Sequence, residues 1–203
     1  MKTFERARGT AAFALVLALA ACSGASAPVA TPARPGPTAS TASQLPGETR
    51  AAGAQLEQAW ATAKLVNVST GESFRIADLA ASGKVVFLET MAIWCTNCRL
   101  QQREAATAFE ALDSERAVWI AIDVESSESA EALARYREQN GFPFTYVIAD
   151  AELSRALVAD FGDVVLSPPS VNIVVIGTDG RVAAMRGHRG ADEIRQLAAD
   201  FGA

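Results

Sequence analysis

The sequence predicts an α/β domain in which helices and a sheet pack in layers. Two observations support this class. Short apolar runs typical of buried strands alternate with amphipathic stretches typical of helices, and the chain closes with a hairpin pattern followed by a helix. The chain has 203 residues, of which half are hydrophobic and a fifth are charged. This length allows one ordinary domain with additional segments.

The part of the chain before its paired cysteines contains a hairpin pattern and one strongly apolar run. The turn at residues 69–72 separates two short strand patterns. The run at 85–88, Val-Val-Phe-Leu, is typical of a strand buried on both faces. We therefore expect a short helix at residues 55–63 and two hairpin strands at 65–68 and 73–76. A helical turn at 78–82 and a buried strand at 85–88 should follow.

Helices and strands also alternate in the second half of the chain. A helix is expected directly after the cysteines, because residues at three- and four-residue steps share one of its faces, namely Cys98, Gln102, Ala105, Phe109 and Leu112. Ser126 or Ser127 would cap the next helix, which ends at an Asn-Gly pair. The remaining elements are expected as strands at 118–122, 144–148, 171–176 and 182–185, and helices at 127–140, 150–162 and 191–201.

The first 21 residues are typical of a secretory signal peptide. Lys2, Arg6 and Arg8 precede an apolar run at residues 10–21, which is shorter than a membrane span requires. The sequence Leu-Ala-Ala-Cys ending at Cys22 resembles the bacterial lipobox. This resemblance implies cleavage before Cys22 and a diacylglycerol on its sulfur. The alternative is an ordinary signal peptide that contains a cysteine.

Residues 22–54 are predicted to be a lipidated linker rich in Pro, Ala and Thr. They hold five of the eight prolines and have too little apolar bulk to fold. The folded domain is expected at residues 55–203. The net charge of −5, with no long basic run, does not suggest a nucleic-acid partner.

The cysteine count excludes several classes of small protein. Only Cys22, Cys95 and Cys98 are present, which is too few for a framework of several disulfides. A structural zinc site needs four Cys or His ligands, and His188 is the one histidine, so we expect no metal. We expect His188 to be a solvated loop residue.

The segment from Trp94 to Cys98 is the candidate redox site, because it lies between a buried strand and a helix. A cysteine at a helix N-terminus is favoured as a thiolate, which is the attacking species in disulfide exchange. We expect Cys95 to be the exposed nucleophile and Cys98, one turn further, to resolve the mixed disulfide. The alternative is an inert structural disulfide. No cofactor is expected beyond the Cys95–Cys98 pair.

The stretch from residue 64 to 203 resembles the thioredoxin superfamily and is most similar to its extracytoplasmic TlpA/ResA-like branch. Four features support the resemblance: the strand 85–89 leading into the Cys-x-x-Cys segment, the preceding hairpin and turn, the extra strand and helix between Gly141 and Gly162, and the Ser-Pro-Pro-Ser sequence at 167–170. The resemblance implies a three-layer fold with a central mixed sheet, an N-terminal hairpin and a strand–helix insertion.

The resemblance also assigns roles to residues around the cysteines. It places a cis-proline at Pro169, next to the cysteines. The preceding Pro168 would contact substrate with its carbonyl only, since proline has no N–H. Glu89 corresponds to the buried acid of the family, whose pKa is raised by desolvation and which exchanges a proton with Cys98. Trp94 would contact substrate or shield the sulfurs.

The Thr96-Asn97 dipeptide between the cysteines would set the redox potential. It matches neither the Gly-Pro of thioredoxin nor the Pro-His of strong oxidants. The direction of electron flow is therefore open at this point.

The resulting hypothesis is an extracytoplasmic lipoprotein on the periplasmic side or the cell surface. It would reduce disulfides of exported proteins, such as apocytochrome c or copper-site cysteines, with a membrane partner as electron donor or acceptor. One alternative is a disulfide-introducing oxidant on the same fold. Another is a copper-binding assembly factor of the Sco type, although that group uses a Cys-x-x-x-Cys pair and a histidine. A peroxidase is less favoured, because the cysteine arrangement of peroxiredoxins is absent.

Overall fold

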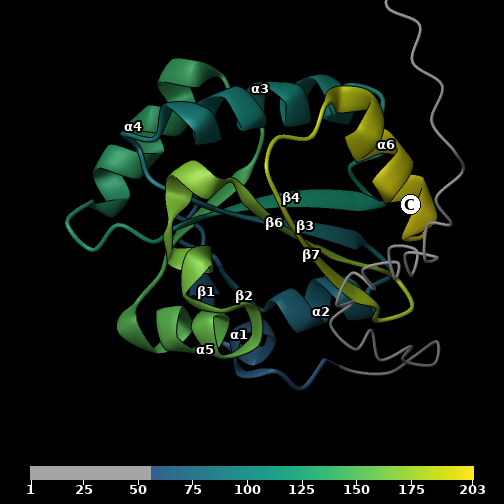
Figure 1. Cartoon of the computed structure of the whole chain (residues 1–203), viewed down its shortest axis with the longest axis horizontal. Helices are drawn as coiled ribbons and strands as arrows, with labels where there is room; N and C mark the ends of the chain where they lie inside the picture. Colours follow the sequence, from purple (N-terminus) through teal and green to yellow (C-terminus); the bar gives the residue numbers. More distant parts are fainter. Residues whose placement is uncertain (1–55) are drawn as a thin grey trace, which may run out of the picture. The chain divides into compact units, whose positions relative to one another are not determined.

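The computed structural model describes residues 56–203, so the predicted signal peptide, Cys22 and the linker lie outside the described residues. A five-stranded mixed sheet forms the centre of this part (Figure 1). Its strand order is β5-β4-β3-β6-β7, with β3, β4 and β5 parallel and β6 and β7 antiparallel to their neighbours. The strands are β3 (Val85–Met91), β4 (Ala117–Asp123), β5 (Thr145–Ile148), β6 (Asn172–Ile176) and β7 (Val182–Arg186).

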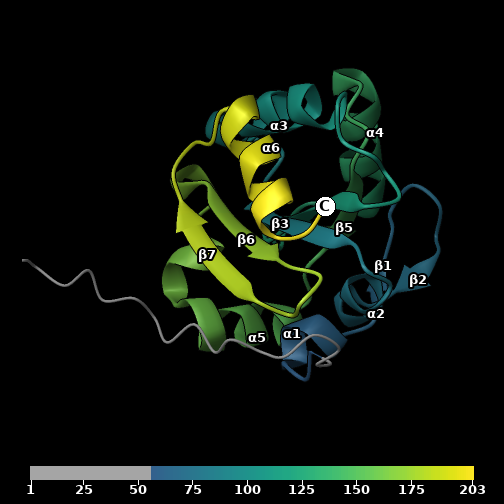
Figure 2. The ribbon, with the colours of Figure 1, turned by 90° about the vertical axis from the view of Figure 1, so that its right-hand side faces the viewer.

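Helices cover both faces of the sheet and complete the three layers. On one face lie α3 (Thr96–Phe109), α4 (Ala130–Asn140) and α6 (Ala191–Asp200), and on the other lie α1 (Ala59–Thr62), α2 (Ile76–Ala81) and α5 (Ala151–Phe161) (Figure 1). Figure 2 shows α6 beside α3 over the sheet, with β7 at one sheet edge. No helix in the described range 56–203 is both long and apolar enough to cross a bilayer.

Each face of the sheet has its own hydrophobic core, because side chains along a strand point to alternate faces. The core under α3 and α6 contains Phe87 and Trp119, whose rings stack at 5.5 Å, together with both cysteines. The core under α1, α2 and α5 contains Trp60 and the aliphatic side chains of the alternate strand positions. All of β3 is buried, as its apolar sequence predicts.

Several element boundaries differ from those expected. The hairpin strands are shorter than expected: they are β1 (Leu65–Val66) and β2 (Ser73–Phe74), which form a separate two-stranded sheet. The capping residue of α4 is Ser129, whose side chain accepts from the Ala132 N–H, and not Ser126 or Ser127. The end of α4 at Gly141 is confirmed, since this glycine has φ +68°, which favours glycine.

The segment before β6 differs from the expected cis-proline loop. Two short 3₁₀ turns, η1 (Asp163–Leu166) and η2 (Pro168–Ser170), fill it, and no peptide bond within 56–203 is cis. The expectation of a cis bond at Pro169 is therefore wrong. In its place, the N–H groups of Ser170 and Val171 close the turn on the carbonyls of Ser167 and Pro168. The chain then enters β6 through Val171 at φ +47°.

Candidate active site

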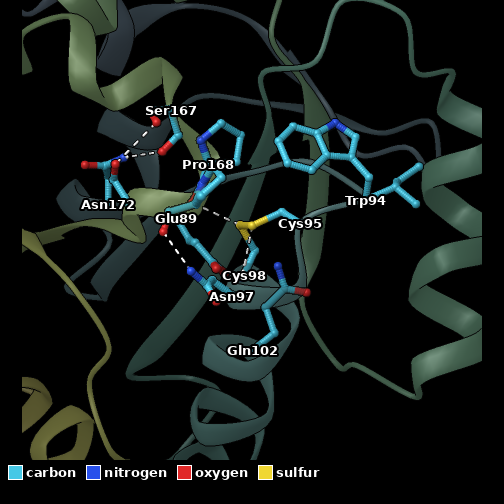
Figure 3. The surroundings of a disulfide bond; sticks show 12 residues. Glu89, Trp94, Cys95, Asn97, Cys98, Gln102, Ser167, Pro168 and Asn172 are labelled. Atoms are coloured by element: carbon cyan, nitrogen blue, oxygen red, sulfur yellow. Dashed lines mark hydrogen bonds between the residues drawn. A yellow bond between two sulfur atoms is a disulfide. The ribbon is translucent and has the colours of Figure 1, made fainter.

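The two cysteines lie where the central strand β3 passes into α3, and their sulfurs form a disulfide (Figure 3). Cys95 is the N-cap of α3, and the backbone N–H of Cys98 points at Cys95 Sγ at 3.1 Å. An N–H group and the helix dipole at this position favour a thiolate once the bond is reduced. The predicted placement of Cys95 at a helix N-terminus is thus confirmed.

Both sulfurs are buried in this oxidised form. Cys95 is 1% exposed and Cys98 is 0% exposed, because both pack into the core that also contains Met91, Ala92 and Val171. The expectation that Cys95 is exposed is therefore wrong for the disulfide form. The neighbouring Trp94 is instead 57% exposed.

The proline turn contacts the disulfide through backbone carbonyls. The Pro168 oxygen lies 3.2 Å from Cys98 Sγ and also accepts the Val171 N–H at 3.0 Å. The Pro169 oxygen accepts from Asn97 Nδ2 at 3.0 Å. In the disulfide, Cys98 Sγ carries no proton to donate, so the Pro168 carbonyl keeps one of its two lone pairs. The role of the Pro168 carbonyl in substrate binding stays a prediction, and Asn97 ties the Cys-x-x-Cys segment to this turn.

The conformation of Val171 is strained. A β-branched residue rarely adopts a positive φ, and such residues persist where the surrounding structure holds them. Here the Val171 carbonyl accepts the Gly187 N–H, and Asn172 Nδ2 donates to the carbonyls of Val164 and Ser167. These bonds fix the turn at the distance from Cys98 described above.

Glu89 lies in the middle of β3 and is completely buried, as predicted. Burial raises its pKa to about 8, while hydrogen bonding from the side chains of Gln102 and Trp119 acts in the opposite direction. The Trp119 indole donates to Glu89 Oε2 at 3.1 Å. A pKa of about 8 lies close to the ~8.5 of an ordinary thiol, so a proton can pass between the two groups at little free-energy cost.

Gln102 belongs to the same buried polar group and escaped the sequence-based prediction, which assigned it only to the inner face of α3. Its Oε1 accepts from Tyr146 at 2.7 Å and from Tyr136 at 3.2 Å. Burial raises the pKa of both tyrosines, so both hydroxyls stay protonated and act as donors. The Gln102 Nε2 and Glu89 Oε1 atoms are both buried and have no hydrogen-bond partner among residues 56–203. The Gln102 side chain acts to lower the pKa of Glu89.

Three acidic residues after β4 form a second group near the cysteines that sequence reasoning missed. Asp123 ends β4 and is completely buried, while Glu125 and Glu128 follow in the loop before α4. Glu125 and Glu128 reach the segment before Cys95. Their signal in the sequence is weak, because acids after a strand are usually solvated.

Other candidate residues lie away from the sulfurs or are solvated. Thr96 is exposed at the first position of α3, and His188 is exposed in the loop after β7. Within residues 56–203, no group of three His, Cys, Asp or Glu side chains gathers in a metal-binding arrangement.

The fold and the disulfide together define a class of protein, the thioredoxin-type thiol–disulfide oxidoreductases. The chain belongs to the AhpC/TSA family, whose sequence model matches residues 57–185. A search of curated proteins finds no match.

Solved structures with the same fold include a thiol:disulfide interchange protein of the thioredoxin family from Chlorobium tepidum TLS, with a TM-score of 0.55 and 21% identity over 70% of this chain and 93% of that one. A secreted disulfide oxidoreductase from Mycobacterium tuberculosis has a TM-score of 0.55 and 16% identity over 70% and 97% of the two chains. StoA from Bacillus subtilis has a TM-score of 0.51 and 16% identity over 67% and 96%. At these identities the likeness establishes the thioredoxin-like fold.

Proposed function

We propose that the protein is a lipid-anchored, extracytoplasmic thiol–disulfide oxidoreductase that reduces disulfides of exported proteins. The observation that carries this proposal is the Cys95–Cys98 disulfide at the start of α3, with the Cys98 N–H on Cys95 Sγ and a buried acid on the adjoining strand. Apocytochrome c and copper-site cysteine pairs are the substrate classes that the TlpA/ResA-like resemblance suggests.

The reaction begins with the reduced dithiol. The Cys95 thiolate attacks one sulfur of a substrate disulfide and forms a mixed disulfide, and the other substrate sulfur leaves as a thiolate. Cys98 then passes its proton to the Glu89 carboxylate and attacks Cys95 Sγ. This step closes the Cys95–Cys98 bond and releases the second substrate sulfur. Two electrons move from the enzyme dithiol to the substrate, so a membrane dithiol partner must return two electrons for the next cycle.

The Pro168 carbonyl has a role in the reduced enzyme. At 3.2 Å from Cys98 Sγ, this carbonyl can accept a hydrogen bond from the Cys98 thiol. The bond favours the neutral thiol and so keeps Cys98 protonated until the mixed disulfide forms. Cys95 instead receives an N–H group. Cys95 thus faces a hydrogen-bond donor, which favours its thiolate, and Cys98 faces an acceptor, which favours its neutral thiol. This difference makes Cys95 the attacking and Cys98 the resolving residue.

The central experiment is trapping with Cys98→Ser. This variant should accumulate mixed disulfides through Cys95 when incubated with a membrane and periplasmic extract, and reduction should release the bound proteins for identification. Cys95→Ser is the matched control and should trap nothing. If Cys98→Ser captures no more protein than Cys95→Ser, the proposed catalysis is refuted.

The direction of electron flow is tested by the equilibrium potential of the pair. A reductase of exported proteins should have a potential below roughly −200 mV, whereas a strong oxidant lies near −120 mV. Equilibration of the full chain with glutathione and dithiothreitol buffers measures this value. A potential near that of the strong oxidants would contradict the reductase proposal and would support the alternative that the protein introduces disulfides.

The proposed anchor depends on Cys22. Two or three acyl chains hold a protein on a membrane far more firmly than one, at ~0.8 kcal/mol per buried methylene. Metabolic labelling with a fatty acid should therefore mark the parent protein in the membrane fraction, and Cys22→Ser should be unlabelled and soluble. Equal labelling of both proteins would contradict the lipid anchor.

A further inference from the structure

The two residues before Cys95 are bound by acidic side chains from the loop between β4 and α4. The backbone N–H of Ile93 donates to both carboxylate oxygens of Glu128, at 3.0 and 2.9 Å. The Trp94 indole donates to Glu125 Oε2 at 3.3 Å, and this bond lowers the pKa of Glu125. These contacts join residues more than thirty positions apart. The segment that leads into the nucleophile is thus fixed by two carboxylates that belong to a different element.

Asp123 connects the two carboxylates. Its Oδ1 accepts the Glu125 backbone N–H at 2.9 Å, and its Oδ2 has no hydrogen-bond donor among residues 56–203 although it is completely buried. Burial raises the pKa of Asp123, and the nearby acidic side chains of Glu128 and Glu125 act in the same direction.

The contacts connect the loop after β4 to the chain before Cys95 at two points. Glu128 accepts the Ile93 N–H, and Glu125 accepts the Trp94 indole N–H while its own backbone N–H is held by Asp123. The chain between these contacts leads directly into Cys95, whose own N–H bonds the Ala92 carbonyl at 3.0 Å.

We propose that Asp123 and Glu128 are positioning residues for Cys95: Glu128 holds the backbone N–H of Ile93, and Asp123 holds the start of the loop that carries Glu128. The inference rests on the proposed function and deepens it. Glu89 acts on the resolving thiol Cys98 from β3. Asp123 and Glu128 act on the attacking thiol through the 92–95 turn, which sets the distance from Cys95 Sγ to the start of α3.

The test compares alkylation of Cys95 in full-length reduced protein carrying Cys98→Ser. Labelling is read from the peptide that contains Cys95, so the state of Cys22 does not matter. Glu128→Ala removes the acceptor for Ile93 and should slow labelling at neutral pH about tenfold, equivalent to a rise of about one unit in the thiol pKa. Glu128→Gln keeps an acceptor oxygen and removes a charge, so it should label at the parent rate or faster.

The sign of the change separates positioning from simple charge. If Glu128 acted only as a nearby negative charge, removing it would favour the thiolate, and both Glu128 variants would label faster. That result, or an unchanged rate in Glu128→Ala, would overturn the proposal. Glu110→Gln, the same change at an exposed residue beyond the end of α3, is the matched control and should label at the parent rate.

Asp123→Asn is a second variant that does not depend on the folding of Glu128→Ala. Its amide oxygen keeps the acceptor for the Glu125 N–H, so labelling should equal that of the parent, whereas Asp123→Ala removes this acceptor and should label more slowly. Equal rates for the two Asp123 variants would refute the role of Asp123. Trapping of substrates by Cys98→Ser is scored separately, so failure of the proposed function is distinguishable from failure of the positioning role.

Discussion

At the residue scale, the chemistry of the site depends on carboxyl groups placed where water cannot reach them. A buried Glu89 retains its proton far above the usual pH range for a carboxyl group, and its pKa of about 8 matches it to a thiol partner. Sequence reasoning could identify Glu89 and both cysteines, because their positions follow from one strand and one helix. It could not identify Gln102 or Asp123 as parts of the site, since their contacts come from neighbouring strands and helices that meet only in the folded chain.

The variant Glu89→Gln tests the proton transfer. The amide cannot accept the Cys98 proton, so closure of the disulfide from the mixed intermediate should slow roughly 100-fold. The rise of the parent rate with pH through about 8, expected from the Glu89 carboxylate, should disappear in the variant. Rapid-quench analysis of the mixed disulfide measures both effects. A variant with the parent rate and pH profile would exclude Glu89 from the step.

The variant Gln102→Leu tests the amide between Glu89 and the tyrosines. It removes the polar side chain that lowers the pKa of Glu89, so the pKa of that carboxyl should rise further and the pH profile should move to higher pH. It also leaves two tyrosine hydroxyls without their acceptor, which should cost about 1–3 kcal/mol of stability for each unsatisfied group. Urea unfolding and the pH dependence of disulfide closure are the measurements. Stability lost without a shifted profile would leave Gln102 a structural residue only.

At the element scale, the strands were predictable and the turn beside the disulfide was not. Continuous apolar runs marked β3, β4 and β6, because strands buried on both faces need no polar alternation. The sequence between Gly162 and Val171 offered two adjacent prolines and no periodicity. Asn172 holds this segment, because its Nδ2 donates to the carbonyl of Val164 in η1 and to that of Ser167, which lies between the two 3₁₀ turns. The length of β3, which places Glu89 inside the strand, followed from pairing with β4 and β6.

The end of α4 provides an element-scale prediction. Gly141 has φ +68° and open space around its Cα, so Gly141→Ala introduces backbone strain and no clash. The expected cost is about 1 kcal/mol. Gly141→Asn is the matched control and should cost less, since asparagine tolerates this conformation. Equal losses for the two variants in thermal unfolding would contradict the assignment of the cost to backbone conformation.

At the scale of the whole molecule, the three layers and the mixed sheet followed from the alternation of strands and helices together with the resemblance stated above, whereas the order of the strands did not. The burial of Cys95 did not, since it depends on packing between β3, α3 and the η2 turn. The buried acids also affect the stability of the entire domain. An acid with a raised folded-state pKa stabilises the fold fully below its unfolded pKa, and this contribution is lost as the pH rises through the folded value.

The predicted consequence is a stability difference that depends on pH. For Glu89, the loss should extend from about pH 4.5, its ordinary pKa, to about pH 8. Relative to the parent, Glu89→Gln should therefore gain stability as the pH rises across this window, by a few kcal/mol in total. Urea unfolding at a series of pH values gives the difference directly. A difference between variant and parent that does not change with pH would show that Glu89 titrates normally in the folded protein.

The burial of both sulfurs limits which molecules can react with the disulfide. Small thiols and oxidants in solution meet a cysteine, Cys95, that is only 1% exposed, next to the exposed indole of Trp94. We expect that a docking protein which contacts this indole can displace the neighbouring backbone, whereas a small molecule cannot. The proposed reductase would therefore pass electrons to docked proteins in preference to small thiols in solution.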